Sequence, residues 1–171
     1  SWVMSVASKA GIGDRLSINP MEFEESDLII IWGSNPVYTQ INLMKHINRA
    51  RKLRGTKLVV IDPYCSATAK AADIHLSPMP GTDSALACAI MHVLFRDGWA
   101  DREYLEKYTD DPSGLEAHLK TRSPQWASRI TGVSKEEIEE LAANYGKTKR
   151  SIIRVGYGLS RSRNEIGRAH V

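Results

Sequence analysis

Two uninterrupted apolar segments, each ending in a polar turn, constrain the fold of this chain more than any other feature. Residues 28–31 are Leu-Ile-Ile-Ile and lead into Trp-Gly-Ser-Asn-Pro at 32–36, and residues 57–61 lead into Asp-Pro-Tyr at 62–64. Apolar runs that do not alternate with polar residues are typical of strands buried on both faces of a parallel sheet. Residues 37–54 between them show helical spacing. A strand-helix-strand unit crosses over right-handed, so both turns are expected at one edge of the sheet.

The remaining sequence extends this pattern. A short strand is expected at 74–76, a long helix from Thr82 or Asp83 to about residue 97, further helices over 101–145, and a last strand from residue 151. Asp101 and Ser134 are expected N-caps of two of these helices, and Ser134 with Glu137 has the spacing of a capping box. We therefore predict an α/β fold of three layers, with a mainly parallel, Rossmann-like sheet and a helical excursion. The expected segments are an α/β dinucleotide-binding region at 1–100, a helical segment at 101–150, and a further strand with a truncated cofactor-facing turn at 151–165.

The polar turns carry the residues that can bind a ligand. Gly33 permits close backbone approach, while Ser34 and Asn35 offer hydrogen bonds, and the amides of a helix that starts here would suit a phosphate. Asp62 stands where dinucleotide folds place a ribose-binding acid. Asp83 can either cap its helix or bind the edge of a guanine through two hydrogen bonds. Each turn taken alone can also be explained as a turn or cap without a ligand, and for Asp83 alone the helix cap is the favoured interpretation.

Taken together, the order and spacing of the turns are more specific than any one of them. In order and spacing, residues 31–36, 60–63, 72–73 and 80–86 resemble the molybdopterin oxidoreductase family, which includes formate dehydrogenases, nitrate reductases and dimethyl sulfoxide reductase. The resemblance covers nearly all of residues 1–165 and implies an internal fragment of a molybdenum-dependent, or tungsten-dependent, oxidoreductase. It implies a molybdenum bis(molybdopterin guanine dinucleotide) cofactor, a two-electron reaction on a small-molecule substrate, and electron transfer to an iron–sulfur cluster or another carrier.

The resemblance also implies which residues contact the cofactor. Trp32, Gly33, Ser34 and Asn35 would line the pyrophosphate and pterin, Asp62, Pro63 and Tyr64 the nucleoside, Gly81, Thr82 and Asp83 the guanine, and Gly156, Tyr157, Gly158 and Arg161 would form a later cofactor-facing turn. Many family members have arginine where this chain has Tyr64, which puts a contact from that side chain in doubt. The metal ligand and any 4Fe–4S cluster would lie upstream, so no catalytic residue and no metal ligand is assigned here.

Composition excludes several other classes. A net charge of +3 is too small to indicate nucleic acid binding, and two cysteines without paired spacing exclude a zinc or iron–sulfur site within this stretch. No apolar run approaches the ~20 residues that span a bilayer, so direct membrane insertion is not expected. The five histidines show no metal-binding spacing, and a structural role is favoured for each. The sequence does not fix the compartment.

Two alternatives stay open at this point. One is a Rossmann domain that binds an ordinary dinucleotide, although the G-x-G-x-x-G fingerprint is absent. The other is a non-catalytic scaffold relative of the kind found in respiratory complexes, which would be expected to lose the set of Asn35, Asp62 and Asp83 that this chain retains. Residues 166–171 are expected to be a non-native tail, and the fragment by itself is expected to be inactive.

Overall fold

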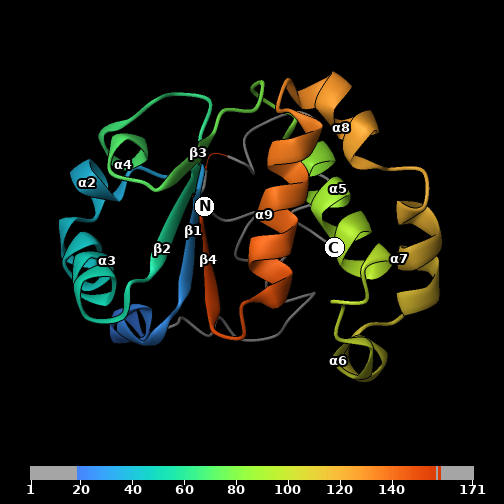
Figure 1. Cartoon of the computed structure of the whole chain (residues 1–171), viewed down its shortest axis with the longest axis horizontal. Coiled ribbons are helices and arrows are strands. Elements are labelled where there is room, and N and C mark those ends of the chain that lie inside the picture. The colour runs from blue at the N-terminus through green and yellow to red at the C-terminus, as the bar shows by residue number, and fades with distance from the viewer. Residues whose placement is uncertain (1–18, 157, 159–171) are drawn as a thin grey trace, which may run out of the picture. The chain divides into compact units, whose positions relative to one another are not determined.

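The computed structural model describes residues 19–156 and residue 158, and it has an α/β fold (Figure 1). The strands of the sheet run in the order β3-β2-β1-β4. The predicted fold class is therefore confirmed. The chain divides into two compact units, Ser1–His75 with Arg150–Val171, and Leu76–Lys149.

The first unit holds the sheet. β1 pairs in parallel with both β2 and β4, and Trp32 lies opposite Ile61 on one side and Val155 on the other. Three strands thus end at the same level, as the crossover rule predicted for the first two. The elements are η1 (Pro20–Glu25), β1 (Leu28–Trp32), α2 (Pro36–Thr39), α3 (Ile41–Arg54), β2 (Lys57–Ile61), α4 (Ala67–Lys70), β3 (Ile74–Leu76, which extends one residue past this unit) and β4 (Ser151–Val155).

The helix expected over 37–54 is interrupted. Gln40, with φ −146° and ψ 59°, separates the short helix α2 from α3. The last turn of α2 closes locally, because the Thr39 hydroxyl and the Gln40 amide bond back to the carbonyls of Asn35 and Pro36. The side chain of Gln40 accepts a hydrogen bond from Arg154 of β4 at 3.2 Å. Periodicity missed the break because Val37 of α2 packs against the same core cluster that contains Leu43 and Met44 of α3.

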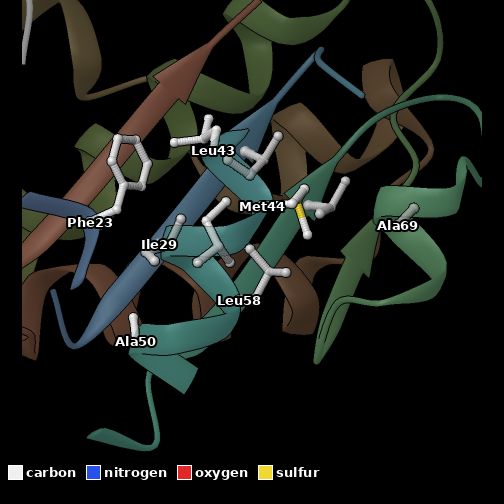
Figure 2. Packing of buried hydrophobic residues seen from close by; sticks show 10 residues of the cluster. Phe23, Ile29, Leu43, Met44, Ala50, Leu58 and Ala69 are labelled. Atoms are coloured by element: carbon white, nitrogen blue, oxygen red, sulfur yellow. The ribbon is translucent and has the colours of Figure 1, made fainter. Parts of the chain in front are cut away.

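The core of this unit lies between α3 and one face of the sheet (Figure 2). Ile29 and Leu58 on the strands are fully buried, as is Ile47 on α3, and Phe23 of η1 joins the same cluster. Alternate residues on the strands, Ile30, Val59 and Ile61, face the other side of the sheet and are also buried. Burial of both sets agrees with the unbroken apolar runs from which the strands were predicted.

The second unit is helical and is organised around α5, which contacts α7, α8 and α9. Its helices are α5 (Asp83–Arg96), α6 (Arg102–Tyr108), α7 (Pro112–Leu119), α8 (Pro124–Thr131) and α9 (Lys135–Lys147). The predicted N-caps are confirmed, since Asp101 accepts from the amide of Tyr104 and Ser134 forms a capping box with Glu137. The contacts of α5 group it with these helices, whereas the segment drawn from the sequence at 1–100 included it.

Asp27, just before β1, ties three parts of the first unit together. Its carboxylate accepts from Arg54 of α3 at 2.7 Å and from Arg150, next to β4, at 3.0 Å. The hydrogen bond from Arg54, followed by that from Arg150, lowers the pKa of Asp27 below its ordinary value of 3.8. The ion pairs therefore stabilise the folded state above this pH, and their contribution is lost as the pH falls through the lowered pKa.

We accordingly expect Asp27→Asn to lower the melting temperature at pH 7, and the gap from wild type to close as the pH falls well below 3.8. Thermal unfolding followed by circular dichroism across this pH range measures the gap. The matched control is Asp110→Asn, which removes an exposed carboxylate that has no ion pair with any described residue. A difference in melting temperature that stays constant with pH would show that the Asp27 side chain stabilises the fold through hydrogen bonding and not through its charge.

Candidate functional site

The candidate site lies at the carboxyl edge of the sheet in the first unit. β1 is flanked by β2 on one side and by β4 on the other, and the chain that leaves β1 continues through α2 and α3 to β2. Strand order therefore changes direction at β1. In open parallel sheets, ligands bind beyond the carboxyl ends of the strands at such a switch point. The turns after β1 and β4 flank this position.

Gly33 and Gly156 bring these two turns into direct backbone contact. The amide of Gly156 donates to the carbonyl of Trp32 at 2.7 Å, and the amide of Gly33 donates to the carbonyl of Ile61 at 2.8 Å. Gly33 has a φ of +61°, which glycine adopts without strain. A Cβ added to Gly156 would lie 1.8 Å from the Gly33 carbonyl oxygen. Both glycines are thus required by the backbone geometry of the edge.

Ser34 and Asn35 supply hydrogen-bond donors at the edge. Their backbone amides donate to no residue in the described part of the chain, and both residues are partly exposed. Asn35 occupies the N-cap position of α2, yet its side chain does not cap the helix. Its Oδ1 instead accepts a hydrogen bond at 2.7 Å from the hydroxyl of Thr68 on α4. The turn therefore offers donors and suits an anionic or otherwise acceptor-rich ligand.

Asp62 follows β2 and shapes the neighbouring turn. Its Oδ1 accepts from the Tyr64 amide at 2.8 Å and so forms an Asx turn, while its second carboxylate oxygen has no partner among the described residues. The imidazole of His75 donates from Nε2 to the Asp62 carbonyl at 2.8 Å, a structural role as predicted. Pro63 and Tyr64 are exposed. One oxygen of Asp62 holds the turn and the other can accept from a ligand hydroxyl.

The other predicted site residues are distributed differently. Trp32 is the last residue of β1 and is only 8% exposed, so its side chain belongs to the buried core next to the turn. Gly81, Thr82 and Asp83 belong to the second unit, where Gly81 has a φ of +78° and Asp83 is the first residue of α5. Thr82 takes the N-cap position, but its hydroxyl donates to the Met79 carbonyl at 2.6 Å and does not cap the helix.

Gly158 is exposed, and Tyr157 and Arg161 lie outside the described residues. The first unit thus brings together the turns at 33–35, 62–64 and 156. The predicted contacts of all these residues with a cofactor stay predictions.

Thr68 is the functional candidate that sequence reasoning missed. It is fully buried on a four-residue helix, and its only sequence signal is a threonine between two alanines shortly after the Asp62 turn. A polar residue flanked by alanines gives no periodic pattern in so short a helix. Its role became visible only when the fold placed it against Asn35, 33 residues away in the chain.

Several other ionisable groups have structural partners. Within residues 19–156 and 158, no three side chains of the metal-binding types gather at one place. His46 pairs with Glu24 at 2.7 Å, and His92 donates to the Leu119 carbonyl at 2.8 Å. In the second unit, the hydrogen bond from Arg102 lowers the pKa of Glu116. No described helix has the length and apolar character needed to cross a membrane. These observations assign no metal centre to the described residues.

Comparison with known proteins identifies the family. The family model for molybdopterin oxidoreductases matches residues 4–167. A probable oxidoreductase, YoaE of Bacillus subtilis, is 41% identical over 161 residues, which are 90% of this chain and 24% of the relative. The alpha subunit of F420-dependent formate dehydrogenase 1 of Methanococcus maripaludis is 35% identical over 159 residues, or 90% of this chain and 23% of the relative.

A third relative supports the family, and a solved structure shows the same fold. Dimethyl sulfoxide reductase DmsA of Haemophilus influenzae is 30% identical over 179 residues and is matched over 22% of its length. Acetylene hydratase from Pelobacter acetylenicus has the same fold, with a TM-score of 0.74 and 23% identity over 92% of this chain and 22% of that one. The chain spans about a quarter of the length of the curated relatives named here. It belongs to the molybdopterin oxidoreductase family.

Proposed function

We propose that this chain is part of a molybdenum-dependent oxidoreductase and that it binds one guanine dinucleotide of a molybdenum bis(molybdopterin guanine dinucleotide) cofactor. The observation that carries the proposal is the donor-rich turn at 33–35, which faces the switch point of the sheet and is held against Gly156. Family membership supplies the identity of the ligand, and the turn supplies the chemistry that a pyrophosphate needs.

Each residue of the edge would have a binding role. The amides of Ser34 and Asn35 and the side-chain nitrogen of Asn35 would donate to the pyrophosphate or to neighbouring acceptor atoms. The second carboxylate oxygen of Asp62 would accept from a hydroxyl of the nucleoside. Gly156, which has no side chain, would let the turns after β1 and β4 approach each other closely without filling the space that the ligand needs. Gly81, Thr82 and Asp83 would bind the guanine, a role that rests on the family resemblance.

The chemistry of the reaction would come from the cofactor. When bound, the molybdenum centre supplies two-electron exchange with a small-molecule substrate, and the electrons pass to an iron–sulfur cluster or another carrier. The residues of this chain bind and orient, and none is assigned a proton transfer. A 4Fe–4S cluster, and the contact with an electron-transfer partner or subunit, would belong to other parts of the whole protein. Relatives include formate dehydrogenase and dimethyl sulfoxide reductase, but a shared fold does not decide the substrate.

The test is a cofactor analysis of the whole protein that contains this chain. We expect the full-length gene, expressed anaerobically with ample molybdate, to yield protein that carries molybdenum and releases about two GMP per metal on acid hydrolysis. Molybdenum is measured by mass spectrometry of the metal and GMP by chromatography, both per polypeptide.

Other results would contradict the proposal in distinguishable ways. A folded protein with neither molybdenum nor GMP would identify a non-catalytic scaffold. Binding of NAD(H) without molybdenum would identify an ordinary dinucleotide domain. One GMP per metal would retain the family chemistry but reject the two-dinucleotide cofactor.

A further inference from the structure

The side chain of Thr68 is buried next to the candidate site and contacts one residue of it, Asn35. Thr68 is fully buried on α4, and its hydroxyl lies 2.7 Å from Oδ1 of Asn35. We propose that Thr68 is a positioning residue that sets the orientation of the Asn35 amide, so that Asn35 presents N–H donors to the cofactor. This inference rests on the proposed function, because it assumes that the edge at Asn35 binds a cofactor.

The hydrogen bonds of Thr68 support one direction for the contact, in which the hydroxyl donates to Asn35. The backbone amide of Val37 donates to the Thr68 hydroxyl oxygen at 3.2 Å. The one hydrogen of the hydroxyl is then available for Oδ1 of Asn35, and the 2.7 Å separation is typical of a hydroxyl that donates to an oxygen. With Oδ1 engaged, the amide nitrogen of Asn35 and its two hydrogens remain for a ligand. No residue in the described part of the chain accepts from that nitrogen.

The surroundings of Thr68 make this orientation rigid. The hydroxyl of Ser66 caps α4 by accepting from the amide of Ala69 at 3.2 Å. Ala69 belongs to the core cluster with Leu58 and Met44, where Figure 2 shows it beside the sheet. Because α4 is anchored to the core, Thr68 holds its position, and rotation of the Asn35 amide would break the partly buried hydrogen bond from the Thr68 hydroxyl.

The orientation predicts the chemistry of the cofactor group that meets Asn35. An amide that presents its nitrogen selects an atom that accepts hydrogen bonds, such as a phosphate oxygen, and disfavours an amine or a ring N–H. If Asn35 could flip freely, it would serve either kind of group. Thr68 thereby contributes to the choice of ligand without touching it.

The experiment compares cofactor release from whole-protein variants at Thr68 with release from a matched control. Thr68→Val removes the hydroxyl and keeps the shape, whereas Thr68→Ser keeps the hydroxyl. The control is Thr56→Val, because Thr56 is 3% exposed, donates its hydroxyl to the Ser26 carbonyl at 2.6 Å, and precedes β2 at the end of the strand away from Asp62. Release is measured as GMP that appears in the filtrate after dilution and acid hydrolysis, together with the melting temperature.

We expect Thr68→Val to release cofactor about tenfold faster than wild type. Without the Thr68 hydroxyl, the Asn35 amide would no longer be oriented and would lose one hydrogen bond to a charged group of the cofactor. Thr68→Ser should release it within about twofold of the wild-type rate. Thr56→Val should also lower the melting temperature, because it too loses a buried, hydrogen-bonded hydroxyl, yet it should release cofactor at the wild-type rate. This combination separates a positioning role from general loosening of the fold.

Three results would overturn the inference or its basis. Equal release by wild type and Thr68→Val would reject the role of Thr68 while leaving the proposed function intact. Equally fast release by Thr68→Val and Thr56→Val would show a general effect of stability. Wild-type protein without GMP would reject the proposed function itself. Should Thr68→Val not fold, Thr68→Cys, which keeps the size and only a weak donor, must release cofactor faster than Thr68→Ser for the inference to stand.

Discussion

Gly156→Ala should strongly destabilise the edge of the sheet. The new Cβ would lie 1.8 Å from the carbonyl oxygen and 2.7 Å from the carbonyl carbon of Gly33. Both are backbone atoms, so neither can move aside as the end of a side chain could. The strands must separate at this edge, which breaks the 2.7 Å hydrogen bond from Gly156 to Trp32. We expect a loss of about 3 kcal/mol or more in the free energy of unfolding.

The measurement is the free energy of unfolding in urea together with bound GMP, both in the whole protein. Gly158→Ala is the matched control for the free energy of unfolding alone, because a Cβ at Gly158 meets nothing within 4 Å, whereas Gly158 also belongs to the predicted cofactor-facing turn. The control should stay within about 0.5 kcal/mol of wild type, as exposed substitutions usually do. If Gly156→Ala were as stable as Gly158→Ala and kept its GMP, the close approach of the two turns would be wrong.

Asn35→Asp should weaken cofactor binding strongly while changing the stability of the fold little. Aspartate has the shape of asparagine, and one of its oxygens can still accept from Thr68. The other oxygen would place a negative charge where the amide offered two N–H donors. Like charges in contact cost several kcal/mol, so binding of a phosphate should weaken by about 100-fold or more.

Cofactor release and the melting temperature test this prediction. Asn48→Asp is the control, since it makes the same change on the exposed side of α3. We expect the melting temperatures of both variants to stay close to wild type, and only Asn35→Asp to lose GMP. Tighter retention of the cofactor by Asn35→Asp would mean that the group opposite residue 35 donates hydrogen bonds, and the orientation inferred from Thr68 would then be wrong.

Local sequence patterns were sufficient to predict most elements of this fold. The buried runs at 28–32 and 57–61, the strand at 151–155 and the long helix at 83–96 follow from apolar spacing, and the caps at Asp101 and Ser134 follow from side chains that bond to nearby amides. The break at Gln40 was missed because Val37 before it and Leu43 after it pack against the same core cluster. The apolar spacing therefore continues across the break.

The sequence by itself determined the fold class, the two strand-end turns and the family resemblance, because these depend on residue types at short spacings. Only the tertiary structure decided the strand order β3-β2-β1-β4 and the contact of Gly156 with Gly33, which join parts of the chain that are far apart in sequence. It also placed Thr68 against Asn35. Such pairs form when burial of the core brings distant segments together, and no local propensity of either residue specifies its partner.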